Sequence, residues 1–135
     1  MAVEDLDVVG VWPDLTGKTL DQLIAQESWF EGELDDEANV IWLQVAGDWH
    51  RLYFDNDAIY WATAPNGPRA KDAAPDEEPE FPLNDLTAKF SLGGATVSST
   101  NGQWIEDGTE VTLHFEGGKT VTFRNRFDTT TVLVG

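Results

Sequence analysis

The chain has 135 residues, 41% of them hydrophobic, and its 25 acidic residues against 8 basic ones leave a formal net charge of −17. A field of that sign repels nucleic acid and anionic membrane, so we expect neither as a partner, and it speeds encounter with basic proteins. There is no cysteine, which excludes disulfides, thiol nucleophiles and thiolate-ligated metals. Solubility and adaptation to high salt are two further explanations of the acidity, and the sequence leaves them open.

Length and hydropathy favour one domain spanning residues 1–135. No apolar run approaches the roughly 18 residues of a membrane span. The first cation is Lys18, so no basic region precedes an apolar core as it would in a secretory signal. We therefore expect a soluble cytoplasmic protein.

The N-terminal third predicts a strand and then a helix. Val8 to Trp12 is β-rich and is stopped by Pro13. Thr19 to Glu27 has the pattern of a short helix, because Thr19 and Gln22 have capping-box spacing and three apolar residues follow at i, i+3 and i+4. A charged turn at 35–37 is expected to lead into the next strands.

Residues 40–63 predict a meander of three antiparallel strands. Val40 to Val45 is almost wholly apolar, which is typical of a strand covered on both faces. Gly47-Asp48 suits a two-residue type II′ hairpin turn, and Asp55-Asn56-Asp57 suits a second turn. Between the turns, Trp49, Arg51 and Tyr53 alternate with His50, Leu52 and Phe54, and Ala58 to Ala62 runs back as the third strand.

The composition changes abruptly over residues 64–82. This stretch carries four prolines before Pro82 and an acidic run at 76–78. Proline removes backbone donors and like charges repel, so we expect a long acidic, proline-rich loop at about 64–82 rather than a domain boundary.

After residue 86 the chain is β-rich again. Val111, Leu113 and Phe115 alternate with Thr112 and His114, as in a half-buried strand. Gly117-Gly118 predicts a hairpin into a strand with Val121 and Phe123 inward, and residues 130–134 can add another strand. The predicted fold class is α+β, mainly antiparallel β: a curled sheet or two-layer sandwich of hairpin meanders with one short N-terminal helix. A small β-barrel is the alternative.

The sequence carries no catalytic signature. It has no G-x-S-x-G elbow and no phosphate-binding glycine loop, and His50 and His114 each lie in a strand opposite an apolar face. Asp55-Asn56-Asp57 resembles the opening of a calcium-binding loop, but Tyr60 and Asn66 stand where that loop needs glycine and glutamate. We predict no catalytic residues, no metal and no cofactor, and nothing in the sequence requires an enzyme.

The aromatic residues suggest a binding surface instead. Six tryptophans exceed what a small β core needs, and Trp, Tyr and Arg dominate the energetics of protein interfaces. Core packing is the competing explanation, since strand aromatics also stabilise one another. The candidate partner-binding residues are an aromatic group that could share one sheet face with an arginine, and an acidic rim around it: Trp49, Arg51, Tyr53 and Trp61, with Asp48, Asp55 and Asp57.

Three functions remain as hypotheses. The first is an acidic, non-enzymatic protein that associates with a basic protein partner, in the manner of an immunity protein or inhibitor. The second is a small β-barrel or sandwich that binds a small apolar ligand in a tryptophan-lined pocket. The third is an acid–base enzyme using His50 or His114, which requires those imidazoles to meet each other or a carboxylate in a cleft.

Overall fold

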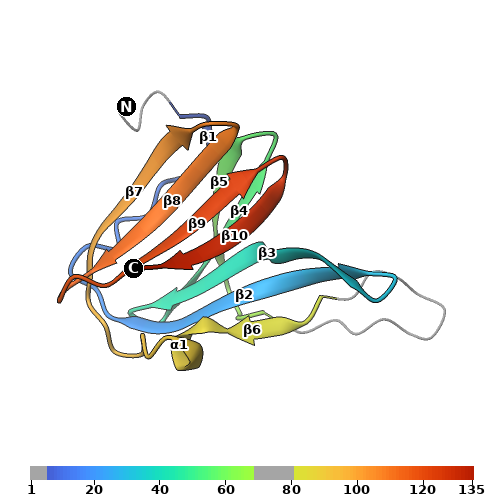
Figure 1. Cartoon of the computed structure of the whole chain (residues 1–135). Helices are drawn as coiled ribbons and strands as arrows, with labels where there is room; N and C mark the ends of the chain where they lie inside the picture. The colour runs from blue at the N-terminus through green and yellow to red at the C-terminus, as the bar shows by residue number, and fades with distance from the viewer. Residues whose placement is uncertain (1–5, 69–80) are drawn as a thin grey trace.

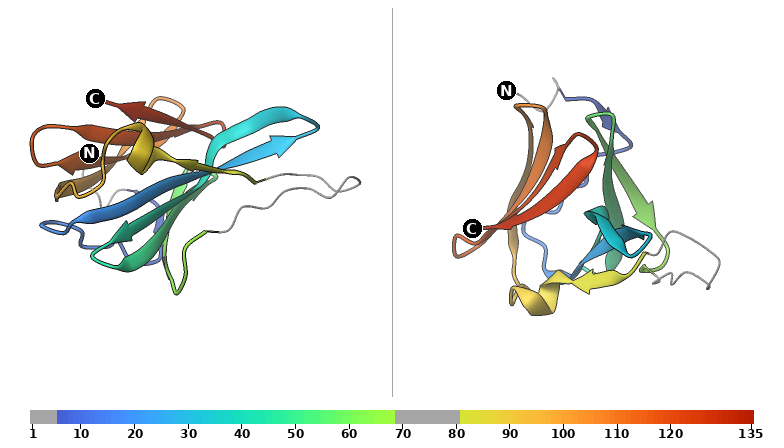
Figure 2. Two further views of the ribbon diagram at one scale, coloured as in Figure 1. Left: turned by 90° about the horizontal axis from the view of Figure 1, so that it is seen from below. Right: turned by 45° about the vertical axis from the view of Figure 1, so that its right-hand side comes forward.

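The structure, a computed structural model, describes residues 6–68 and 81–135. It is mostly antiparallel β, in two sheets that face each other in a sandwich-like layout and do not close into a barrel (Figures 1 and 2). The predicted β-rich class is confirmed. The predicted N-terminal helix is wrong.

The larger sheet has six strands in the order β1-β5-β4-β3-β2-β6. β1 pairs in parallel with β5, and every other neighbouring pair is antiparallel. The strands are β1 (Val8–Val9), β2 (Leu20–Phe30), β3 (Glu33–Val45), β4 (Asp48–Asp55), β5 (Ala58–Ala64) and β6 (Leu83–Asp85).

The smaller sheet has four strands in the order β10-β9-β8-β7, all antiparallel. They are β7 (Val97–Ile105), β8 (Gly108–Phe115), β9 (Thr120–Arg126) and β10 (Thr129–Val134). A short helix, α1 (Leu86–Lys89), joins the sheets, and its first turn is capped by the Asp85 carboxylate, which accepts from the backbone N–H groups of Thr87 and Ala88.

The core lies between the two sheets. Apolar residues alternate with polar ones along the strands, so each sheet presents one apolar face to the other. Leu43, Leu52 and Ile59 from the larger sheet and Val111 and Phe123 from the smaller one are all 0% exposed. Each such side chain contributes about 1.5–3 kcal/mol relative to an exposed position.

The stretch predicted as a helix is strand β2, paired with β3 on one side and β6 on the other. A β-bulge between Leu20 and Gln22 adds a residue to β2. Leu20 and Leu23 are therefore both fully buried although they are three positions apart. The bulge reproduces the i, i+3 spacing of a helix, and Ile24 is buried on the opposite face of the sheet at 8% exposure.

Two turns also differ from the predictions. The 35–37 segment lies inside β3, and the chain reverses earlier, at Glu31-Gly32, where φ is 51° and 77°. The next connection is Ala46-Gly47 rather than Gly47-Asp48, with φ of 49° and 85°. Positive φ at both central residues defines a type I′ turn, which matches the twist of the flanking strands.

The β2–β3 hairpin extends well beyond the other strands (Figure 1). Phe30 and Leu34 near its tip are 51% and 47% exposed. Of the predicted proline-rich loop at 64–82, residues 69–80 lie outside the described residues. Ala64 ends β5, and the carbonyl of Pro82 accepts from the backbone N–H of Glu27 at 2.9 Å.

Candidate functional site

The outer face of the larger sheet carries three of the predicted partner-binding residues. Trp49, Arg51 and Tyr53 alternate along β4 and point away from the buried Leu52. The ring of Tyr53 stacks on that of its cross-strand neighbour Tyr60, with centroids 4.7 Å apart and planes 5° from parallel. The guanidinium of Arg51 lies 5.7 Å from the ring centroid of Trp42 on β3.

Trp61 does not join this group. It pairs with Leu52 across the β4–β5 hairpin and so faces the core, where it is 3% exposed. Its ring meets that of Trp12 edge-on, with centroids 5.6 Å apart. The reason is register: a two-residue turn at Asn56-Asp57 sets Tyr60 opposite Tyr53, which places the next residue on the other face.

The three predicted acids do not form one rim. Asp48 and Asp55 are the first and last residues of β4, which separates them by about 23 Å at a strand's rise of about 3.3 Å per residue. Asp57 lies in the turn beyond Asp55. The predicted site is therefore divided between an outer aromatic face, the core and the two ends of β4.

The structure instead gathers acids where three hairpin turns meet. The connections Asn56-Asp57, Glu106-Asp107 and Phe127-Asp128 lie at the same end of the molecule, at the top in Figure 1. We call these six residues, with Asp55, the turn end. Two hydrogen bonds join its parts across the sheets: Asn56 N–H donates to Asp128 Oδ1 at 3.1 Å, and the Thr109 hydroxyl donates to the Asp57 carbonyl at 3.3 Å.

The turn end combines negative charge with exposed aromatic surface. Its carboxylates are those of Asp55, Asp57, Glu106, Asp107 and Asp128, and exposed Arg126 adds one positive charge beside them. A hollow of about 430 Å³ lies between the turns, lined in part by Trp104 and Ile105. Phe127 borders the hollow and is 79% exposed. A turn position does not need so exposed an aromatic ring.

Sequence reasoning found Asp55 and Asp57 but missed Phe127, Asp107 and Asp128. Asp107 and Asp128 have φ of 65° and 59° and Phe127 has φ of 52°. Aspartate tolerates this left-handed region, whereas phenylalanine rarely adopts it. An aromatic residue directly before an Asp-Thr pair between two β-rich runs was the available signal.

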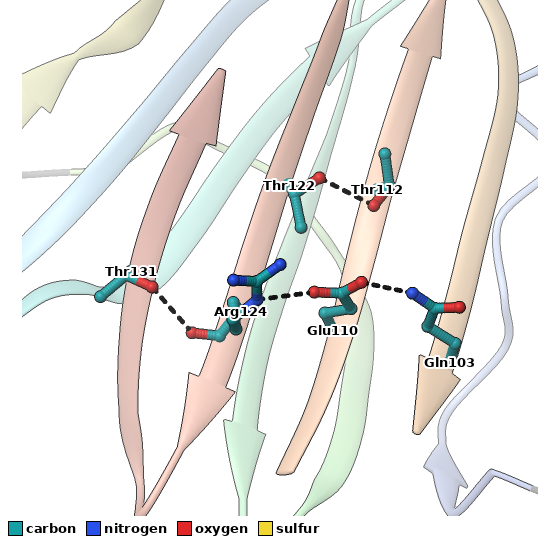
Figure 3. Close-up of polar contacts among 6 residues, drawn as sticks. All are labelled: Gln103, Glu110, Thr112, Thr122, Arg124 and Thr131. Atoms are coloured by element: carbon teal, nitrogen blue, oxygen red, sulfur yellow. Dashed lines mark hydrogen bonds and ion pairs between the residues drawn. The ribbon is translucent and has the colours of Figure 1, made fainter. Parts of the chain in front are cut away.

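The outer face of the smaller sheet carries a polar ladder rather than an exposed cluster (Figure 3). Glu110 is 6% exposed. One of its carboxylate oxygens accepts from the side-chain amide of Gln103 and the other from Nε of Arg124 at 2.8 Å. The Thr112 and Thr122 hydroxyls lie 2.9 Å apart one rung along. Because both carboxylate oxygens are engaged, this group is a structural cross-strand network.

The two histidines do not share a site. His50 is on β4 beside the β5 edge, where burial lowers the pKa of its imidazole, with Lys18 lowering it and Asp48 raising it as smaller effects. His114 is on β8 of the smaller sheet, where it pairs with Thr120 on β9 and Ser99 on β7, whereas His50 belongs to the larger sheet. The geometry that an acid–base pair of histidines requires is therefore missing.

Within residues 6–68 and 81–135, no three His, Asp or Glu side chains are grouped so that they could hold a metal ion. None of the helices in those ranges is long and apolar enough to cross a membrane. Comparison with known proteins finds no matching family model, no matching curated protein and no matching solved structure.

Proposed function

We propose that the protein is an acidic, non-enzymatic binding protein that associates with a basic protein partner through the turn end. The observation that carries the proposal is the exposed ring of Phe127 among five carboxylates on turns that hydrogen bonds hold together. Such an arrangement suits a partner that inserts an apolar side chain beside Lys or Arg residues. Neutralising that partner, as an immunity protein or inhibitor does, is the biological role we propose.

Charge and geometry support the proposal in different ways. The net charge of −17 draws a basic protein from a distance and raises the association rate, but it does not choose where the partner docks. An aromatic anchor surrounded by polar groups does fix the docking position, because interface energy concentrates in a few apolar residues. The outer aromatic face is a weaker candidate, since its rings are half-buried against one another and against Gly67, which lies under Trp49.

The test begins with a pull-down from an extract of the source cells, at about 50 mM and about 150 mM salt. A recovered basic protein is then made separately and titrated by calorimetry. We expect one-to-one binding that weakens as salt rises, because the screening length falls from about 14 Å at about 50 mM to about 8 Å at about 150 mM. Absence of a stoichiometric partner at both salt concentrations contradicts the proposal.

Matched variants locate the interface. Glu106→Lys reverses a charge at the turn end, and Glu116→Lys makes the same change on an exposed residue at the opposite end of β8. We expect the first to raise Kd at least tenfold and the second less than about twofold. Phe127→Asn, which suits the left-handed backbone, should raise Kd by more than Phe30→Asn on the β2–β3 hairpin. Equal effects within either pair would place the interface elsewhere.

A further inference from the structure

A second hollow lies at the other end of β5, away from the turn end. β1 pairs with β5 only at Ile59 and Tyr60. Beyond that point the N-terminal segment leaves the sheet, and a pocket of about 330 Å³ opens between this segment and residues 61–63 of β5. This volume is at the lower end of the range for small-molecule sites. At roughly 30 Å³ per water it holds about eleven waters.

Apolar surface makes up most of the pocket walls, and polar side chains contribute the rest. Trp61 and Pro13 contribute to the lining, and Val11 at the rim is 84% exposed. The path of the chain is fixed nearby by Gly10, whose φ is 90° and which lies against the carbonyl of Trp61, where a Cβ atom would clash. The pocket is therefore built by a tight backbone approach, and a planar apolar molecule could cover Val11 and contact the indole.

An unmet hydrogen-bond donor belongs to the same pocket wall. Trp61 is 3% exposed, and its Nε1–H has no hydrogen-bond partner among the described residues. Buried indole N–H groups normally have one, so an orphan donor in a residue that lines a pocket calls for an acceptor. The donor atom itself has less than 1 Å² of exposed surface, so a ligand oxygen reaches it only when the indole or the side chains that cover it shift.

The polar side chains favour an anionic acceptor. Lys18 lines the pocket and brings an ammonium group, and His50 lines it as an imidazole whose pKa burial lowers. Asp14 is the acid in the lining, and its Oδ1 accepts from the backbone N–H of Thr16 at 3.3 Å, which ties it to its own turn. The negative field of the whole chain opposes an anion at long range, but physiological salt screens that field beyond about 8 Å.

We propose that this pocket binds a small planar apolar molecule bearing a carboxylate, with the ring against Trp61 and the carboxylate near Lys18. The site is separate from the turn end and does not depend on the partner proposed there.

The test uses three probes with the same ring on the full chain: 2-naphthoate, 2-naphthalenemethanol and 2-naphthylmethylamine. Binding is followed by the indole N–H resonances in ¹H–¹⁵N spectra, with Trp61 assigned from Trp61→Phe or by sequential assignment. We expect 2-naphthoate to bind with Kd at or below about 1 mM, a typical limit for a ligand of this size. Movement of the Trp61 N–H resonance is part of the expected result.

Charge variants separate specific binding in the pocket from non-specific binding elsewhere on the chain. Lys18→Gln should weaken 2-naphthoate at least fivefold, whereas Lys89→Gln, the same change on the exposed end of α1, should change Kd less than twofold. Failure of all three probes to bind overturns the proposal. So do tighter binding of the amine, equal effects of the two lysine variants, or an unmoved Trp61 resonance on the wild-type chain.

Discussion

The Asp36 carboxylate is buried, and substitutions there should separate the stability that its hydrogen bonds contribute from the cost of ionising it. The side chain lies on β3 at 6% exposure, and its Oδ1 accepts from the backbone N–H groups of Ala38 at 3.0 Å and of Thr130 on β10 at 3.2 Å. Burial raises the pKa of Asp36; the two hydrogen bonds oppose this, and the charges of Asp35 and Glu37 add to it. The carboxylate thus joins the two sheets while it is costly to ionise.

Replacing Asp36 by alanine and replacing it by asparagine should change the free energy of unfolding in different directions. Asp36→Ala leaves two backbone donors without their acceptor, and at about 1–3 kcal/mol for each unsatisfied buried group it should cost about 2–6 kcal/mol. Asp36→Asn keeps an oxygen at the Oδ1 position and removes the charge. It should therefore be neutral or stabilising at pH 7, by about 1.4 kcal/mol for each unit by which folding raises the pKa.

The pH dependence follows from the direction of the shift. Because the folded state holds the Asp36 proton more tightly than the unfolded chain, this group's favourable contribution is fully present below the ordinary pKa of 3.8. It is lost as pH rises through the higher folded-state pKa. The stability of the wild type relative to Asp36→Asn should therefore fall from about pH 4 upward and then level off.

Urea unfolding followed by tryptophan fluorescence between about pH 4 and pH 8 measures these differences. Glu116→Gln removes the same charge from an exposed residue and controls for the net charge of the chain. The reasoning is refuted if Asp36→Asn loses as much stability as Asp36→Ala at pH 7. A wild type that gains stability over Asp36→Asn as pH rises would refute it equally.

Two further predictions concern stability. Gly10→Ala and Gly17→Ala both place a Cβ at positive φ, which costs about 1 kcal/mol, but only the Gly10 variant also clashes with the Trp61 carbonyl. Gly10→Ala should therefore lose about 1–3 kcal/mol more stability than Gly17→Ala in urea unfolding. Equal losses would contradict the close approach of Gly10 to Trp61. Arg124→Leu leaves the buried Glu110 carboxylate without its charged partner, so it should cost about 2 kcal/mol more than Glu110→Gln. Equal costs in the same assay would mean that solvent screens the pair.

Sequence patterns predicted the strands well where one face is buried and the period is regular. The alternation of Val111, Leu113 and Phe115 with Thr112 and His114 is observed, and so is the Asn56-Asp57 turn. The pattern failed at β2 because a bulge imitates helical spacing. A bulge depends on pairing with β3, so local periodicity cannot distinguish it from a turn of helix.

The candidate site was less predictable than the strands because it depends on long-range pairing. The residue opposite Tyr53 follows from the adjacent turn, so the inward direction of Trp61 could have been derived from the Asn56-Asp57 turn alone. The contact between the 56–57 turn and the 127–128 turn could not have been derived from the sequence, because it depends on how the two sheets stack. Hydrophobic alternation says which face is buried but not which sheet covers it.

The acidic residues divide by what their carboxylates contact. Asp36 and Glu37 accept from the N–H groups of Thr130 and Val132 on β10, an edge strand of the smaller sheet, the latter at 2.6 Å. They cover donors that would otherwise invite pairing with another chain. This part of the negative charge has a structural role that neither solubility nor salt adaptation requires.

Three acids of the turn end have no such explanation. Among the described residues, the carboxylates of Asp55, Glu106 and Asp107 accept no hydrogen bond or ion pair. The backbone at Asp107 needs only tolerance of a φ of 65°, which asparagine or glycine would supply without charge. Grouped like charges repel, so these acids cost stability that neutral residues would spare. A basic partner would offset that cost, because it turns the repulsion within the free protein into attraction within the complex.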